Sequence, residues 1–297
     1  MTMSGQTWSV VAPDGRTLGG RAFGPADGDP VLFVAGAATG SGMVFGERLL
    51  HERHLRLLTM NRPGMRASTP HPERTIASTA ADYRSAVAGV LGDDQARVPV
   101  VAHSQGSVFG LALALSGAVS GLVLASPGDE TAHPPIRAML PPEATALPDL
   151  VRSAPDEAAR VLSSFDPAAM ESLVLSGSDD ADRAVYRAPA FLARYRDALD
   201  EGFANAGAGY VRDTLLAMGE WHLPLHRMRV PVEVLIGARD AVHSPDRAET
   251  LAARIAGARR TVIDDAGGAL LWTHADAVLD AVARVRAEAR ASSDPMH

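Results

Sequence analysis

Residues 98–110 read VPVVAHSQGSVFG, an apolar run that leads into a serine and then into a helical pattern. Ser104 therefore stands between a predicted strand and a predicted helix, with Ala102 two positions before it and Gly106 two positions after it. A sharp turn from strand to helix requires small residues at these positions, because neighbouring backbone passes close by. Serine is also a common helix N-cap, but its place after a central strand favours a nucleophile at a helix N-terminus, where N–H groups stabilise developing negative charge.

On both sides of this stretch, short apolar runs alternate with helical patterns, which is typical of parallel βαβ units. Pro13-Asp14-Gly15 predicts a turn between two strands. The sequence therefore predicts an α/β fold with a mostly parallel, eight-stranded sheet flanked by helices. The expected strands are residues 7–12, 16–23, 31–35, 55–60, 98–102, 121–126, 232–236 and 260–263.

The alternation stops between residues 127 and 225, where Pro-rich turns (HPPIRAMLPPEATALP) precede helical stretches. We expect an inserted helical cap over 127–225, with residues 1–126 and 226–297 forming the core domain. The cap should decide which substrate is accepted, and its larger apolar residues are candidates for the pocket lining, although we expect most of them to belong to the core. These candidates are Met139, Leu140, Leu162, Phe165, Met170, Phe191, Tyr195, Phe203, Met218 and Trp221.

Composition excludes several classes of protein. The 297 residues carry a net charge of −7 without a block of like charges, which disfavours nucleic-acid and anionic-membrane surfaces. All 28 basic residues are arginine and cysteine is absent, so thiolate, Schiff-base and P-loop lysine chemistry are excluded. The N-terminus lacks a signal-peptide pattern and the apolar runs are too short to span a bilayer, so we expect a cytoplasmic protein.

No histidine pair has convincing metal-ligand spacing. His222 and His226 stand four residues apart, but Pro224 interrupts them. We therefore predict no metal and no cofactor, and a small-molecule substrate as the partner. The oligomeric state stays open.

Three further motifs, together with the Ser104 stretch, resemble the α/β-hydrolase fold superfamily over nearly the whole chain. They are VLFVAGAATGSG at 31–42, NRPGMRAS at 61–68 and VEVLIGARDAVHSP at 232–245. The resemblance implies Ser104 as nucleophile and the backbone N–H groups of Ala37 and Gln105 as oxyanion donors. It also implies Asp240 as the carboxylate that orients a catalytic imidazole, which should follow it in the chain.

That imidazole is missing from its usual place. In VIDDAGGALLWTHADAV (262–278), Gly268 stands where the family has histidine, so the general-base position is vacant. The histidine was removed from an active enzyme, or the chain is a natural member with different chemistry, or another histidine serves. His243 follows Asp240 by three residues and is the nearest substitute, although a loop residue without a catalytic role is the more ordinary interpretation.

The other histidines fit less well. The His103 side chain should point away from Ser104, His274 should face solvent, and His133, His222 and His226 lie at the ends of the cap segment. The favoured function is an esterase-like serine hydrolase acting on an ester or acyl-type small molecule. Without its base it would be slow by a factor on the order of 10³ or more.

Two alternatives belong to other classes. A non-hydrolytic cyclase or lyase would use the pocket and the oxyanion hole without an imidazole, and the missing side chain at Gly268 would enlarge its pocket. A non-enzymatic receptor would bind a small molecule and turn nothing over.

Overall fold

The computed structural model describes residues 5–293, which build one eight-stranded sheet in the order β1-β2-β4-β3-β5-β6-β7-β8. The strands are β1 Gln6–Val11, β2 Thr17–Phe23, β3 Asp29–Val34, β4 Leu55–Met60, β5 Pro99–Ser104, β6 Gly121–Pro127, β7 Val232–Gly237 and β8 Arg259–Ile263. Strand β2 pairs antiparallel with both β1 and β4, and all other pairs are parallel. The predicted α/β class with a mostly parallel eight-stranded sheet is confirmed.

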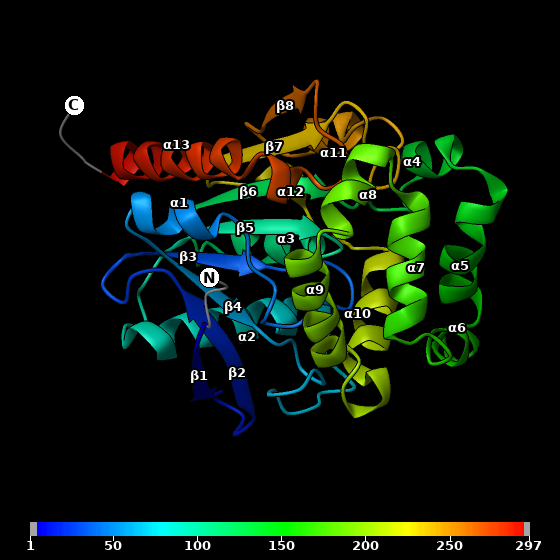
Figure 1. Ribbon diagram of the computed structural model, residues 1–297, viewed down its shortest axis with the longest axis horizontal. Helices are drawn as coiled ribbons and strands as arrows, with labels where there is room; N and C mark the ends of the chain where they lie inside the picture. Colours follow the sequence, from blue (N-terminus) through cyan, green and yellow to red (C-terminus); the bar gives the residue numbers. More distant parts are fainter. Residues whose placement is uncertain (1–4, 294–297) are drawn as a thin grey trace.

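Alternate residues of the central strands point to opposite faces of the sheet, as the twofold period of a strand requires. In β5, Val100 and Ala102 pack on one face and Val101 on the other. Helices cover both faces and bury all three side chains, so these strands are apolar without alternation. On the first face lie α2 Ile76–Leu91, α3 Ser107–Leu115 and α11 Glu249–Arg254, and on the second α1 Glu47–Glu52, α12 Leu270–Thr273 and α13 Ala275–Ser293 (Figure 1).

Between β6 and β7, the chain forms helices that gather beyond the carboxyl ends of β3 and β5 (Figure 1). They are α4 Pro134–Met139, α5 Pro142–Ser153, α6 Pro155–Leu162, α7 Pro167–Gly177, α8 Asp180–Tyr186, α9 Pro189–Gly202 and α10 Ala208–Met218, followed by the short 3₁₀ segment Leu225–Arg227. The prediction of Pro-rich turns over residues 133–148 is wrong, because α4 and α5 both begin in this stretch. Proline at the first helical position lacks only an N–H that would be unpaired anyway, so it starts these helices rather than breaking them.

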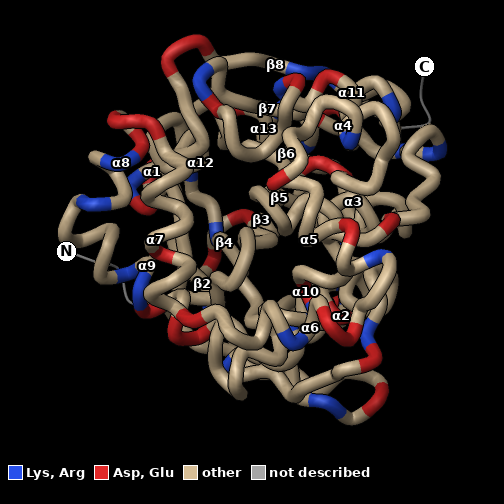
Figure 2. The backbone as a smooth tube through the Cα atoms, turned by 90° about the vertical axis from the view of Figure 1, so that its right-hand side faces the viewer, with Lys and Arg blue, Asp and Glu red and all other residues tan. Residues whose placement is uncertain are grey.

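Acidic and basic residues are interspersed around the outline of the molecule when it is viewed from the side of these helices (Figure 2). Within residues 5–293, no helix is long and apolar enough to cross a membrane.

Candidate active site

Ser104 ends strand β5 in a strained backbone conformation, with a φ of 51°. A β-carbon on Gly106 would lie 2.5 Å from the carbonyl oxygens of both Val34 and Ala35, so only glycine fits there. Helix α3 begins at Ser107, directly after this turn. Strand, tight turn and helix thus occur as the sequence predicts, and strain of this kind is concentrated at functional sites.

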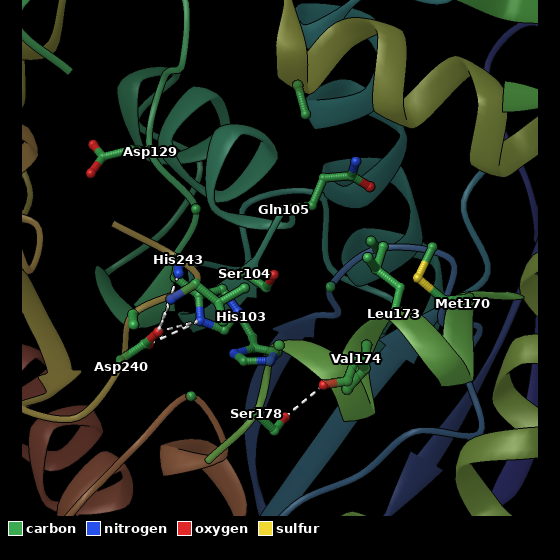
Figure 3. Close-up of a pocket in the computed structure, with 18 of the residues that line it drawn as sticks. His103, Ser104, Gln105, Asp129, Met170, Leu173, Val174, Ser178, Asp240 and His243 are labelled. Atoms are coloured by element: carbon green, nitrogen blue, oxygen red, sulfur yellow. Dashed lines mark hydrogen bonds and ion pairs between the residues drawn. The ribbon is translucent and has the colours of Figure 1, made fainter. Parts of the chain in front are cut away.

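The loop after β3 passes next to Ser104. A β-carbon on Gly36 would lie 3.2 Å from Cβ of Ser104, so the chain around Ala37 runs beside the serine. Gln105 follows Ser104 in the chain, and its amide Nε2 donates to the Thr214 hydroxyl of α10 at 3.1 Å. In the view of Figure 3, Ser104 lies between His243 and Gln105.

Arg62 fixes the loop after β3 through hydrogen bonds to its backbone. Its guanidinium donates to the carbonyl oxygens of Ala35 and Gly36, both at 2.8 Å, and the Thr39 hydroxyl also donates to Gly36 at 3.1 Å. The C=O of Gly36 and the N–H of Ala37 belong to one trans peptide and point in opposite directions. Because Arg62 fixes the carbonyl, the Ala37 N–H is directed away from the guanidinium.

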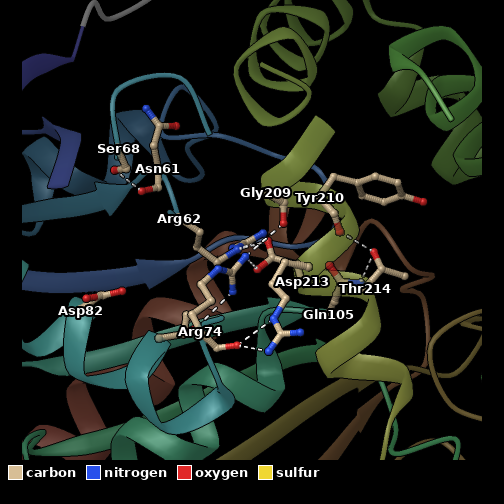
Figure 4. A network of polar contacts seen from close by, with 12 residues as sticks. Asn61, Arg62, Ser68, Arg74, Asp82, Gln105, Gly209, Tyr210, Asp213 and Thr214 are labelled. Atoms are coloured by element: carbon tan, nitrogen blue, oxygen red, sulfur yellow. Dashed lines mark hydrogen bonds and ion pairs between the residues drawn. The ribbon is translucent and has the colours of Figure 1, made fainter. Parts of the chain in front are cut away.

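Arg62 belongs to a fully buried network with Arg74 and Asp213 (Figure 4). Asp213, on α10, accepts from both guanidinium groups, so one carboxylate lies between two cations. Burial alone would lower the pKa of Arg62, but Asp213 keeps it above its ordinary value and therefore keeps Arg62 charged. The sequence pattern around Arg62 was recognised, yet the role of this arginine was not predicted.

The carboxylate of Asp240 and the imidazole of His243 are hydrogen-bonded. Asp240 is buried in the loop after β7, and His243 Nδ1 lies 3.0 Å from its Oδ1 and 2.9 Å from its Oδ2. Asp240 Oδ1 also accepts from the backbone N–H groups of Val242 and His243, both at 3.1 Å. The loop therefore orients its own histidine through its own aspartate.

The charges of this pair stabilise each other. Burial alone would raise the pKa of Asp240, but His243 and the backbone N–H groups hold it well below its ordinary value. Burial alone would lower the pKa of His243, but Asp240 and, more weakly, the carboxylate of Asp182 raise it. Asp240 stays ionised over the whole neutral range, and the imidazole is a stronger base than an isolated histidine.

His103 packs under His243. The ring centroids of the two histidines lie 5.5 Å apart, and His103 Nδ1 donates to the carbonyl of Ala125 at 2.9 Å. Burial lowers the pKa of His103 to about 3, so this ring stays neutral and adds no positive charge beside His243. Trp272 contacts it from α12, with 5.0 Å between the centroids.

Gly268 borders the same cavity as Ser104 and also lies against His243. A β-carbon on Gly268 would be 3.2 Å from Cε1 of His243 and 3.5 Å from Oδ2 of Asp182. The imidazole of another loop therefore lies close to the space that a side chain at residue 268 would occupy. The expected enlargement of the pocket at Gly268 stays a prediction. The doublet Gly267-Gly268 was a signal for this close approach that sequence reasoning did not use.

One cavity of about 670 Å³ brings the predicted site residues together. Its wall on the side of the sheet includes Ala37, Ser104, Gln105, Asp240, His243 and Gly268. Opposite them lie apolar residues of the helices between β6 and β7, including Met170, Leu173 and Val174 (Figure 3). The cavity therefore joins a polar wall to an apolar one.

The ten apolar candidates for the pocket lining divide between the cavity and the core. Six of them, more than expected, line the cavity: Met139, Leu140, Met170, Tyr195, Met218 and Trp221. Leu162, Phe165, Phe191 and Phe203 instead pack in the core between the helices. Sequence reasoning missed Tyr186, Tyr210 and Asp182, since helical periodicity does not show which face of a helix between β6 and β7 meets the rest of the molecule.

Among residues 5–293, the histidines other than His103 and His243 lie outside the wall of this cavity. His274 pairs with the exposed Asp265 at 3.1 Å, and His133, His222 and His226 do not contribute to the lining. Over residues 5–293, no cluster of three histidine or acidic side chains has the arrangement of a metal site.

Comparisons with known proteins agree with this architecture. The model of the alpha/beta hydrolase family matches residues 31–284. A hydrolase from Pseudomonas aeruginosa PA01 is similar in structure, with a TM-score of 0.67 and 22% identity over 95% of this chain and 99% of that one. A thermophilic esterase from Thermogutta terrifontis has a TM-score of 0.69 and 20% identity over 96% of this chain and 99% of that one. An enol-lactonase from Burkholderia xenovorans LB400 has a TM-score of 0.64 and 20% identity over 93% of this chain and 98% of that one. No curated protein sequence matches the chain.

Proposed function

Since the chain belongs to the alpha/beta hydrolase family, we propose that it is a serine hydrolase of small carboxylic esters or lactones, with Ser104 as nucleophile and His243 as general base. One observation carries the proposal: His243 is hydrogen-bonded through Nδ1 to the buried Asp240 on the loop after β7. The base then comes from the loop of the acid itself, three residues further on, and not from the segment after β8, where Gly268 stands.

The roles follow from the hydrogen bonds. His243 donates its Nδ1–H to Asp240, so Nε2 is the nitrogen with a free lone pair. In this mechanism Nε2 takes the proton of the Ser104 hydroxyl as the oxygen attacks the carbonyl carbon, and Asp240 stabilises the imidazolium that forms. The imidazolium returns the proton to the leaving alcohol, and water then releases the acyl group by the same route.

The negative oxygen of the tetrahedral intermediate would be bound by the backbone N–H groups of Ala37 and Gln105. Arg62 supports this assignment, because it fixes the carbonyl of the peptide to which the Ala37 N–H belongs. Donors held in place before the reaction need no reorganisation as charge develops.

The helices over 127–225 act as the cap in this proposal. Met170, Leu173 and Val174 give an apolar wall that suits an uncharged acyl or alcohol part of modest size. Two of the similar structures are an esterase and an enol-lactonase, and both activities fit a serine nucleophile.

The test is turnover of p-nitrophenyl butyrate by the full chain and by the variants Ser104→Ala, His243→Gln and the double variant. We expect each single change to lower kcat by a factor on the order of 10³ or more, and the double variant to be no slower than either, because the two groups act as a unit. His51→Gln, at an exposed position of α1, is the matched control.

A second readout does not depend on choosing a good substrate. An activated organophosphate ester should phosphorylate Ser104, found by peptide mass spectrometry, and should fail to label the Ser104→Ala and His243→Gln variants. Turnover or labelling that is unchanged in His243→Gln would exclude His243 as the base.

A further inference from the structure

Asp182 is a buried carboxylate on α8, one of the helices between β6 and β7. It lines the same cavity as Ser104 and His243. A β-carbon on Gly267 would lie 2.4 Å from its Oδ2, and one on Gly268 would lie 3.5 Å from the same oxygen. The carboxylate therefore packs against the backbone of Gly267 and Gly268, in space that a side chain at residue 267 would fill.

Asp182 and His243 converge on Gly268 from two different parts of the chain. A β-carbon added to Gly268 would lie 3.5 Å from Oδ2 of Asp182 and 3.2 Å from Cε1 of His243. Burial raises the pKa of Asp182, and hydrogen bonds from the nearby backbone N–H groups of Ala269 and Gly268 offset only part of that rise. His243 thus faces a second carboxylate besides its partner Asp240.

The other groups around His243 do not supply that charge. His103, from β5, is neutral at physiological pH, and Asp129, after β6, meets His243 through its backbone N–H, which donates to the His243 carbonyl at 3.1 Å. Arg239, on the same loop as His243, is half-exposed and binds Asp179 at the N-terminus of α8. Asp182 is therefore the negative group that the cap presents to the imidazole.

We propose that Asp182 is a positioning residue for the general base: it supports the Gly267–Ala269 segment against which the His243 ring packs, and its carboxylate stabilises the imidazolium. This inference rests on the proposed function, in which His243 takes the serine proton. The general base His243 is then supported by two carboxylates from different parts of the fold, Asp240 at the edge of the sheet and Asp182 in the cap. The Asp179–Arg239 ion pair, at 3.1 Å, holds the same end of α8 against the loop of Asp240.

The test compares Asp182→Asn with the matched control Asp180→Asn, which removes an exposed carboxylate from the same helix. The His243 ring is followed by NMR during a pH titration, and its signal is identified by its loss in His243→Gln. We expect Asp182→Asn to lower the pKa of His243 by on the order of one unit, as a carboxylate at this range should. Asp180→Asn should leave it unchanged.

Activity supplies the second readout. The pH at which kcat/KM is half-maximal should fall in Asp182→Asn by the same amount as the NMR titration, and Asp182→Glu, which keeps the charge, should restore part of the shift. Asp182→Ser removes the carboxylate with a smaller side chain and replaces Asp182→Asn if that variant does not fold. A His243 titration that is the same in the Asp182 and Asp180 variants would overturn the proposal.

The failure of this inference and that of the proposed function are distinguishable. If the unaltered chain shows no turnover that depends on Ser104, the proposed function fails, and the NMR titration still decides whether Asp182 acts on His243. If turnover depends on Ser104 and His243 but the titration does not respond to Asp182, only the positioning role fails.

Discussion

The imidazole of His243 packs directly against Gly268, where an added β-carbon would lie only 3.2 Å from its Cε1 atom. The two residues belong to different loops at one edge of the sheet, after β7 and after β8. Gly268 and His243 are therefore parts of one arrangement, in which the ring packs against a residue that has no side chain.

A side chain at residue 268 should therefore lower activity. We expect Gly268→Ala to reduce kcat on the order of tenfold, since its β-carbon displaces the ring, and small displacements of a catalytic group reduce the rate steeply. Gly268→His should be slower still. The measurement is p-nitrophenyl butyrate turnover. The control for a general loss of stability is Gly117→Ala, which strains the backbone at a φ of 71° but meets open space. A large gain in Gly268→His would mean that the chain lacks a base.

The dependence of activity on pH should report the state of His243. A general base must be neutral, and Asp240 raises the pKa of His243 above 6.5 against the opposing effect of burial. We expect kcat/KM to fall as pH decreases through a midpoint above 6.5. Asp240→Asn should move that midpoint to lower pH and reduce the maximum rate. A midpoint that does not move in Asp240→Asn would contradict the assignment of this pair.

Arg62→Lys tests the support of the oxyanion loop. Lysine keeps the charge but lacks the planar group that contacts Ala35, Gly36 and Asp213 together. We expect kcat to fall about tenfold or more with little change in KM, because the Ala37 N–H serves the transition state more than the bound substrate. The control Arg16→Lys alters a largely buried arginine that pairs with Asp82. An unchanged kcat in Arg62→Lys would contradict the role of Arg62 in holding the loop.

Asp129 should make the protein less stable as pH rises. Burial raises the pKa of its carboxyl group from 3.8 to about 6, and neither oxygen has a hydrogen-bond partner among the described residues. A folded-state pKa above the unfolded value means that the folded state binds more protons between the two, so stability decreases from about pH 4 to above pH 6.

Asp129→Asn removes this titration while keeping the size of the side chain. The free energy of unfolding of the variant minus that of the unaltered chain is measured in urea at pH 5 and at pH 8. We expect this difference to be more favourable to the variant at pH 8 by on the order of 1 kcal/mol. A difference between the two proteins that is independent of pH would show that Asp129 does not titrate in this range.

Much of the fold was predictable because it depends on local patterns. The eight expected strands match β1 to β8 within one or two residues. For β3 to β7 the reason is that buried parallel strands need continuous apolar sequence. The turn at Ser104 was predictable for a related reason: Gly106 stands where a β-carbon would overlap the carbonyls of Val34 and Ala35. The Pro-rich stretch was misjudged because proline both ends helices and begins them.

What the sequence by itself determined is therefore the sheet, the strand-turn-helix at Ser104 and the place of Asp240 after β7, all of which follow from the side-chain period and from residue size within a few positions. Only the tertiary structure decided which histidine accompanies Asp240, what fills the space beside Gly268, and that Arg62 and Asp182 contact the loops around the site. The physical reason is that these contacts join side chains from separate strands, loops and helices, and their geometry arises only when the sheet brings those segments to one edge.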